Sequence, residues 1–123
     1  MNDDILSPGR VAVVTGAGMG IGAAAARYFA GRGMKLCLFD RNADALQQVA
    51  KELAQAVEVR TVVGDVTSHD DLTRLCDTAY DTFREVALLM NNAGIAAGGG
   101  PWGDIHAWRH LFPHAMTALQ RPQ

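Results

Sequence analysis

A short apolar segment that runs directly into a glycine-rich turn constrains this chain more than any other feature. Residues 11–14 are Val-Ala-Val-Val, residues 15–22 read TGAGMGIG, and an alanine-rich segment follows. Glycine permits a tight reversal, lets the backbone approach a pyrophosphate, and lets a helix begin close to the preceding strand. Such a helix directs its unpaired N–H groups and positive dipole end at the phosphates. The pattern predicts a strand–turn–helix unit that binds a dinucleotide.

The rest of the chain alternates short apolar runs with helical patterns. Apolar runs predict strands at 11–14, 35–39 and 86–90, and residues 58–63 are expected to form a further strand. The segments between them predict helices at 20–32, 43–55 and about 70–83. The second helix has an apolar stripe, formed by Leu46, Val49, Ala50 and Leu53. This alternation predicts an α/β fold: a Rossmann-like doubly wound parallel sheet, truncated to about four strands in the order 3-2-1-4. The ligand is expected at the carboxyl ends of the strands, where the order reverses.

The third helix has the signals of a well-defined start. Thr67 or Ser68 is expected to cap it, and the acids Asp70 and Asp71 stand in its first turn, where they complement the helix dipole.

Composition excludes several classes of protein. The 123 residues are enough for one small domain, and 49% hydrophobic with 20% charged residues is ordinary for a globular chain. A net charge of −2 provides no basic field for nucleic acid, and no apolar run is long enough for a membrane span. The start, MNDD, lacks the basic residues of a signal peptide, so we expect a cytoplasmic protein with Cys37 and Cys76 as buried, reduced thiols.

Four segments together resemble the classical short-chain dehydrogenases/reductases. The stretch TGAGMGIG is similar to the family's glycine motif, and it departs from the G-x-G-x-x-G pattern because position 21 is Ile. LCLFD at 36–40 resembles the second strand with its terminal acid, GDVT at 64–67 the adenine-contacting segment, and NNAG at 91–94 the element after the fourth strand. The resemblance covers residues 8–112 and implies an NAD(P)-dependent oxidoreductase that acts on alcohol or carbonyl groups.

The resemblance also implies a set of dinucleotide contacts. They fall on the glycine motif, the ends of the second and third strands, and the element after the fourth strand. The residues are Thr15, Gly16, Gly18, Met19, Gly20, Ile21, Gly22, Asp40, Arg41, Asp65, Val66, Asn92, Ala93 and Gly94.

The residues that would face the adenosine ribose favour NAD over NADP. Asp40 closes the second strand, where a carboxylate can accept hydrogen bonds from a ribose diol and would repel a 2′-phosphate. Met19 stands where NADP-preferring relatives often carry a basic residue. Arg41 keeps NADP open as the less favoured alternative, since it can pair with a 2′-phosphate.

Three other positions each have a structural alternative to a ligand contact. Asp65 resembles the family's acid that binds the adenine amino group, with backbone contact from Val66, but an acid here is also typical of a turn that starts a helix. Asn91 and Asn92 are expected to tie neighbouring strand ends together and to form a cofactor wall. For Ile21 we prefer core packing over a cofactor contact.

The catalytic residues that the resemblance implies are absent. The family uses a Ser and a Tyr-x-x-x-Lys pair, in which the lysine lies one helical turn after the tyrosine and lowers its pKa. Arg32 and Arg84 follow the chain's two tyrosines at that spacing, and Arg does not replace Lys in this role. The two serines, Ser7 and Ser68, are unsuitable, and the family's upstream Asn falls on Ala115. We therefore assign no catalytic residue to this chain.

The resemblance ends abruptly. Residues 1–112 are expected to form a partial NAD(P)-binding Rossmann domain, and residues 113–123 an unrelated tail that begins with Pro113, where the family continues a helix. A reading-frame change and a truncation followed by a foreign tail both explain this loss. The strand at 86–90 would then be an unpaired apolar edge, so self-association is expected.

A metal site is the competing hypothesis for the last part of the chain. His106, His110 and His114 are spaced by four, and Asp104 is near them. Pro113 interrupts the helix that would align them, and no Glu supplies a base, so a solvated helix is the favoured interpretation and no metal is assigned.

Three hypotheses about function therefore remain. The chain is part of an NAD-dependent oxidoreductase, a module that binds the dinucleotide without catalysis, or a product without a function.

Overall fold

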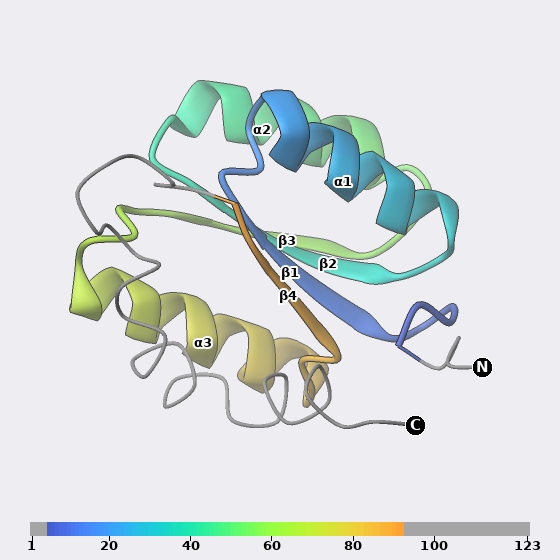
Figure 1. Ribbon diagram of the computed structural model, residues 1–123. Coiled ribbons are helices and arrows are strands. Elements are labelled where there is room, and N and C mark those ends of the chain that lie inside the picture. The colour runs from blue at the N-terminus through green and yellow to red at the C-terminus, as the bar shows by residue number, and fades with distance from the viewer. Residues whose placement is uncertain (1–4, 93–123) are drawn as a thin grey trace.

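Residues 5–92 form alternating strands and helices in the computed structural model, which describes only this part of the chain (Figure 1). The strands are β1 (Val11–Thr15), β2 (Lys35–Asp40), β3 (Val59–Val63) and β4 (Leu88–Asn91). The helices between them are α1 (Gly20–Gly31), α2 (Ala43–Leu53) and α3 (His69–Phe83). No helix in this range is both long and apolar enough to cross a membrane.

The four strands make one parallel sheet in the order β3-β2-β1-β4, as predicted from the sequence. The register pairs Val11 of β1 with Lys35 of β2, and Ala12 of β1 with Leu88 of β4. Because β2 and β4 lie on opposite sides of β1, the strand order reverses at β1. Parallel sheets of this kind have a crevice at the carboxyl ends of the strands where this reversal occurs.

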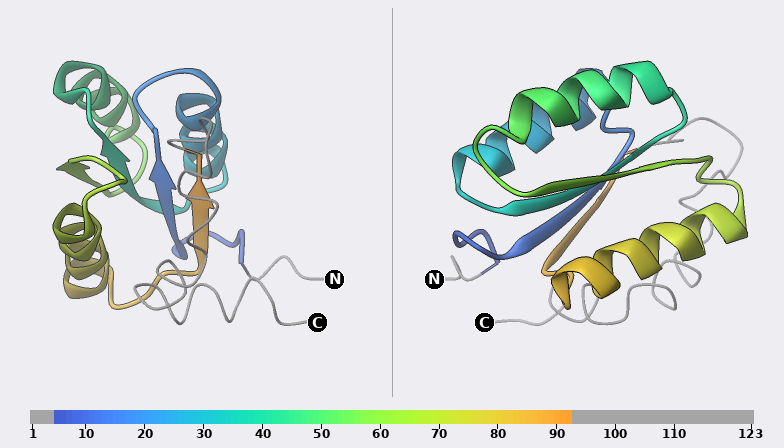
Figure 2. Two further views of the ribbon diagram at one scale, coloured as in Figure 1. Left: turned by 60° about the vertical axis from the view of Figure 1, so that its left-hand side comes forward. Right: turned by 180° about the vertical axis from the view of Figure 1, so that it is seen from behind.

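Helices cover both faces of the sheet, with α1 and α2 on one side and α3 on the other (Figures 1 and 2). The central strands β1 and β2 therefore have continuous buried runs rather than an alternating pattern, and all five residues of β1 are buried. One core cluster joins α1 and α2 to the sheet through Ala12, Val14, Leu36 and Leu38. The second joins α3 to the opposite face through Val13, Cys37 and Phe39. The predicted apolar stripe of α2 is confirmed, since its four residues are the buried ones of that helix.

The helix ends follow from local residues. Asn42 caps α2, and Ser68 caps α3 by accepting a hydrogen bond from the N–H of Asp71, which settles the choice between Thr67 and Ser68. After α1, Gly33 takes a φ of 82°, and the N–H groups of Gly33 and Met34 bond to the carbonyls of Ala30 and Phe29. This is the Schellman arrangement, which turns the chain into β2.

Most predicted bounds differ from the observed ones by one or two residues, and β4 shows why. The apolar run begins at Val86, but pairing with β1 begins at Leu88. Val86 and Ala87 are buried as the chain turns from α3 into the sheet, because apolar character marks burial and not strand pairing. The expectation for the cysteines was half right: Cys37 is buried, whereas Cys76 is half-buried at the side of α3.

Candidate dinucleotide site at the carboxyl edge of the sheet

The glycine-rich turn connects β1 to α1 at the carboxyl edge of the sheet (Figure 1). Gly16 and Gly20 have φ values of 67° and 60°, a left-handed conformation that glycine adopts without a steric penalty. Together they reverse the chain between the end of the strand and the first turn of the helix.

Two further glycines are required for space. A Cβ on Gly22 would overlap the carbonyl oxygen of Gly16 and come within 2.9 Å of Asn92 Nδ2. A Cβ on Gly18 would lie 3.0 Å from Asp40 Oδ2 and 3.1 Å from the Cβ of Ala45. At Gly18 and Gly22 the backbone therefore packs directly against β2, α2 and the end of β4, with no side chain between them.

The amino end of α1 is suited to an anion. Its N-cap residue, Met19, makes no side-chain cap hydrogen bond, and its first turn carries no acidic residue. The other two described helices also begin at this edge, but Asn42 and Ser68 cap them and their first turns hold acids. A helix start that keeps unpaired N–H groups and its positive dipole end favours phosphate oxygens.

Asp40 joins this loop to the end of β2. Its Oδ2 accepts a hydrogen bond from the N–H of Gly18 at 2.8 Å, and its Oδ1 accepts one from the N–H of Asn42 at 2.8 Å. The carboxylate is half-buried, and each oxygen has a second lone-pair direction available for a hydroxyl donor. It lies beside the glycine loop, as the sequence predicts for an acid that binds a ribose.

The asparagine pair ties β4 to β1, which confirms one of its two predicted roles. The buried Thr15 hydroxyl donates to Asn91 Oδ1 at 3.1 Å and accepts from the backbone N–H of Asn92 at 2.9 Å. Asn92 Nδ2 also reaches the carbonyl of Gly16 at 3.5 Å. Ala93 and Gly94, the other two residues of this motif, lie outside the described residues.

Asp65 forms the turn between β3 and α3. Its Oδ1 accepts hydrogen bonds from both the backbone N–H and the hydroxyl of Thr67, each at 2.8 Å. These bonds, and more weakly the guanidinium of Arg41, lower the pKa of Asp65 below its ordinary value of 3.8. The turn interpretation of Asp65 is therefore correct, and an adenine contact through Oδ2 is compatible with it. Val66 packs its side chain against the core on the α3 face.

The preference for Ile21 as a core residue is wrong. Its side chain is 70% exposed, and the neighbouring Met19 is 62% exposed. The buried positions of α1 are Gly22, Ala23, Ala26, Phe29 and Ala30, a stripe that excludes position 21. An exposed apolar side chain at the mouth of the glycine loop is instead available to a ligand, which was the alternative from the family resemblance.

Neither tyrosine of the chain lies at this edge. Helices α1 and α3 begin beside the glycine loop and the Asp65 turn, and Tyr28 and Tyr80 stand near their far ends. Tyr28 is about 12 Å along the helix axis from Gly20. It is 54% exposed, and the guanidinium of Arg32 lies 5.9 Å from its ring centre. Arg84 ends α3 in a left-handed conformation.

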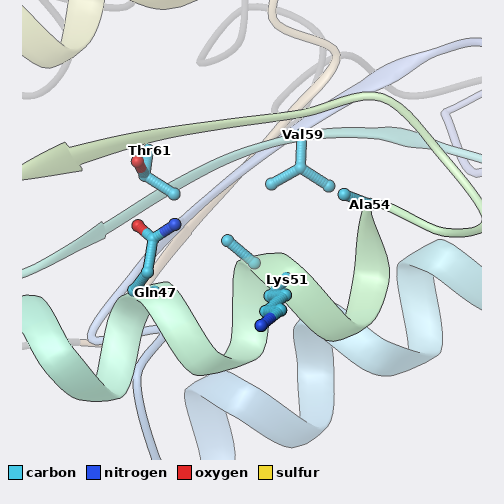
Figure 3. A pocket seen from close by; sticks show the side chains of 6 residues that line it. Gln47, Lys51, Ala54, Val59 and Thr61 are labelled. Atoms are coloured by element: carbon cyan, nitrogen blue, oxygen red, sulfur yellow. The ribbon is translucent and has the colours of Figure 1, made fainter.

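A separate surface pocket of about 210 Å³ lies between α2 and β3 (Figure 3). The side chains that line it are those of Gln47, Ala50, Lys51, Ala54, Val59 and Thr61. None of the residues predicted to bind the dinucleotide is among them. The three candidate metal-binding histidines at 106–114 lie outside the described residues, and residues 5–92 contain no cluster of three or more metal-binding side chains.

A parallel sheet that reverses its order beside a glycine turn defines a Rossmann-like α/β domain. The sequence profile of the short chain dehydrogenase family matches residues 10–119. The chain belongs to this family and aligns with its amino-terminal portion.

The relatives include enzymes with different substrates in their names. Sulfoacetaldehyde reductase 2 of Chromohalobacter salexigens is 40% identical over 95 residues, which are 77% of this chain and 38% of that protein. Galactitol 2-dehydrogenase (L-tagatose-forming) of Cereibacter sphaeroides is 46% identical over 88 residues, which are 72% of this chain and 34% of that protein. The chain thus spans well under half the length of these curated relatives.

Solved structures of the same family have the same fold. A short-chain dehydrogenase/reductase from Burkholderia phymatum in complex with NAD is 38% identical, with a TM-score of 0.70 over 91% of this chain and 43% of that one. A metagenomic short-chain oxidoreductase in complex with NADP is 30% identical, with a TM-score of 0.76 over 95% of this chain and 60% of that one.

Proposed function

We propose that this chain provides the adenosine and diphosphate side of a nicotinamide dinucleotide site in an oxidoreductase that acts on alcohol or carbonyl groups. The observation that carries the proposal is the amino end of α1, which has neither a side-chain cap nor an acid. Gly18 before the helix and Gly22 in its first turn leave the backbone there without side chains. The family supports the same assignment, because the similar structures named above include complexes with NAD and with NADP.

The adenine, its ribose and the diphosphate each have a partner in this proposal. The N–H groups at the start of α1 bind the diphosphate, Asp40 accepts from the adenosine ribose, and Asp65 accepts from the adenine amino group through Oδ2. Exposed Met19 and Ile21 provide apolar contact at the mouth of the loop. The dinucleotide, when bound, supplies the hydride chemistry, and these residues bind and orient it.

NAD is the preferred cofactor in this proposal. The Asp40 carboxylate is held beside Gly18 by two backbone hydrogen bonds, so a 2′-phosphate on the ribose would meet a fixed negative charge. Arg41 is exposed and follows Asp40 directly, so NADP stays the less favoured alternative in this proposal.

The proposal assigns no catalytic residue to this chain. The sequence contains no Tyr-x-x-x-Lys pair, and Tyr28 and Tyr80 lie near the helix ends remote from the glycine loop. The chain alone is then a nucleotide-binding unit without turnover. An assay with a panel of alcohols and carbonyl compounds checks this point: any turnover that Tyr80→Phe abolishes would contradict it.

Calorimetric titration of the 123-residue chain with NAD, NADP and ADP-ribose tests the central claim. We expect NAD to bind more tightly than NADP. ADP-ribose should bind about as well as NAD, because the residues assigned here contact adenosine and diphosphate and not nicotinamide. Absence of binding by all three compounds to the folded chain would overturn the proposal and favour a product without a function.

A further inference from the structure

Two side chains of α3 hold the main chain around Asp65. The backbone N–H of Asp65 donates to Asp71 Oδ2 at 2.9 Å. Arg74 Nη2 donates to Asp71 Oδ1 at 2.9 Å and to the carbonyl oxygen of Val63, the last residue of β3, at 3.0 Å. One ion pair therefore fixes the carbonyl before Gly64 and the N–H after it.

Glycine is required at position 64 because Asp71 packs directly on this turn. A Cβ on Gly64 would lie 2.9 Å from the Cβ of Asp71 and 2.9 Å from Phe39 Cε2. Gly64 is not among the glycines of positive φ, so space and not backbone conformation requires glycine at this position. The close contact between α3 and the turn is thus part of how the site is built.

The direction of the Asp65 carboxylate depends on this turn. Thr67 occupies Oδ1 with two hydrogen bonds, which fixes the side-chain rotamer and leaves Oδ2 to accept from a ligand. The backbone at Asp65 then decides where Oδ2 lies. Asp71 is itself placed by the helix cap, since its N–H donates to Ser68 Oγ at 3.1 Å.

Asp71 is charged at neutral pH. The N–H of Asp65, and then the guanidinium of Arg74, lower the pKa of Asp71 below its ordinary value. The ion pair is solvent-accessible, with 28% of the Asp71 side chain and 52% of the Arg74 side chain exposed. Exposed pairs of this kind contribute little to global stability, so a substitution at either position is expected to leave the domain folded.

We propose that Asp71 and Arg74 are positioning residues for adenine recognition: their ion pair fixes the turn that presents the Asp65 carboxylate to the 6-amino group of adenine. This inference rests on the proposed dinucleotide function. It gives Asp71 a role that its neighbour Asp70 does not have, although both are first-turn acids of the same helix.

The test compares NAD with nicotinamide hypoxanthine dinucleotide, in which an oxygen replaces the 6-amino group. Calorimetry gives the Kd of each for the wild-type chain and for Asp71→Ala, with Asp70→Ala as the matched control that removes one negative charge from the same helical turn. We expect the wild-type chain to bind NAD about tenfold more tightly, since the amino group donates to a charged acceptor. In Asp71→Ala this ratio should fall to about twofold, mainly through weaker NAD binding, whereas Asp70→Ala should keep the wild-type ratio.

A structural defect without a positioning role would weaken both dinucleotides equally. An unchanged ratio in Asp71→Ala, or an equal fall in Asp70→Ala, therefore overturns the inference while the proposed function stands. Wild-type binding of neither dinucleotide overturns both. Arg74→Gln provides the second measurement should Asp71→Ala fail to fold, and it should lower the ratio in the same direction because the Val63 and Asp71 contacts are lost together.

Discussion

The carboxylate of Asp40 accepts a hydrogen bond from the backbone N–H of Gly18, with 2.8 Å between Oδ2 and the nitrogen. Gly18 is buried in the glycine loop, and Asp40 is the last residue of β2. The other oxygen of the same carboxylate accepts from Asn42, the N-cap of α2. One side chain thus connects the loop after β1 to the loop after β2, so the shape of the proposed diphosphate cradle depends on the proposed ribose ligand.

Replacing Asp40 by Ala is therefore expected to damage both stability and binding. The buried Gly18 N–H loses its acceptor, which costs about 1–3 kcal/mol in the free energy of unfolding. NAD affinity should fall at least tenfold in calorimetry, because the ribose loses a charged acceptor. Asp44→Ala, at an exposed position in the first turn of α2, is the control and should change NAD affinity less than twofold. If Asp40→Ala were as stable as the wild-type chain, the Gly18 contact would be shown to contribute nothing to the free energy of unfolding.

Asp40→Asn separates the charge from the hydrogen bonds. Its side-chain oxygen can still accept from one of the two backbone N–H groups, so the loss of stability should be smaller than in Asp40→Ala. Removal of the negative charge should reduce the preference for NAD over NADP. The ratio of the two Kd values measures this, and a ratio equal to that of the wild-type chain would contradict a charge-based preference.

Gly22 and Gly31 offer a second pair of substitutions, within one helix. In Gly22→Ala the new methyl group overlaps the backbone of Gly16, so the glycine loop must move. We expect loss of NAD binding and a destabilisation of about 2 kcal/mol or more. Gly31→Ala adds the same methyl group where no heavy atom lies within 4 Å. It should leave NAD binding intact and stabilise the chain by up to about 1 kcal/mol. Urea denaturation and calorimetry of both variants provide the comparison, and equal effects would exclude a specific role for Gly22.

Much of this fold follows from the sequence because its signals are local and repeated. The continuous apolar run at 11–14 predicted a strand covered on both faces, and α2 buried its predicted stripe of four residues. The parallel order β3-β2-β1-β4 then followed from the doubly wound pattern that the strand–turn–helix unit indicates.

The features that sequence reasoning missed depend on tertiary placement. Ile21 is apolar and helical, but it lies outside the buried stripe of α1, and its side chain is therefore exposed. The contacts of Asp71 with the N–H of Asp65 and with Arg74 form only where α3 packs against the turn after β3, at Gly64. In the sequence, the helix dipole alone was a sufficient reason for an acid at Asp71. The sequence therefore contained no signal for its contact with Asp65.

Arg84 is a site where substitution should stabilise the protein. It ends α3 with a φ of 68°, the one left-handed non-glycine residue in the described part of the chain. Such a conformation costs about 1 kcal/mol in a residue with a Cβ, so Arg84→Gly should raise the free energy of unfolding by up to that amount. Gly33→Ala is the reciprocal change, since Gly33 has a φ of 82° and a Cβ there would lie 3.1 Å from Pro8. It should destabilise the chain by more than 1 kcal/mol. Denaturant titration that found Arg84→Gly less stable would point to an unrecognised contact of the arginine.

The two thiols should be slow to react in the native protein. Burial raises the pKa of Cys37 to about 12, and burial with the nearby charges of Asp77 and Asp81 raises the pKa of Cys76 to about 11. Only the thiolate is nucleophilic, so at pH 8 Cys76 should react roughly ten- to a hundredfold more slowly with a disulfide reagent than the unfolded chain does. Cys37 should react only after unfolding. Fast modification of either thiol in the folded chain would contradict these environments.

The same shifts predict the response of stability to alkaline pH. In the unfolded chain the thiol of Cys37 loses its proton near its ordinary pKa of 9.0, whereas in the folded chain it keeps the proton up to about 12. Between these values the unfolded state binds fewer protons, so stability falls as pH rises, by up to about 1.4 kcal/mol per pH unit for one group. Below pH 9 this contribution is fully present. Cys37→Ala removes the thiol, and its stability should therefore decline less steeply than that of the wild-type chain between pH 9 and 11. Denaturant titrations across this range measure both slopes, and parallel slopes would show that Cys37 ionises alike in both states.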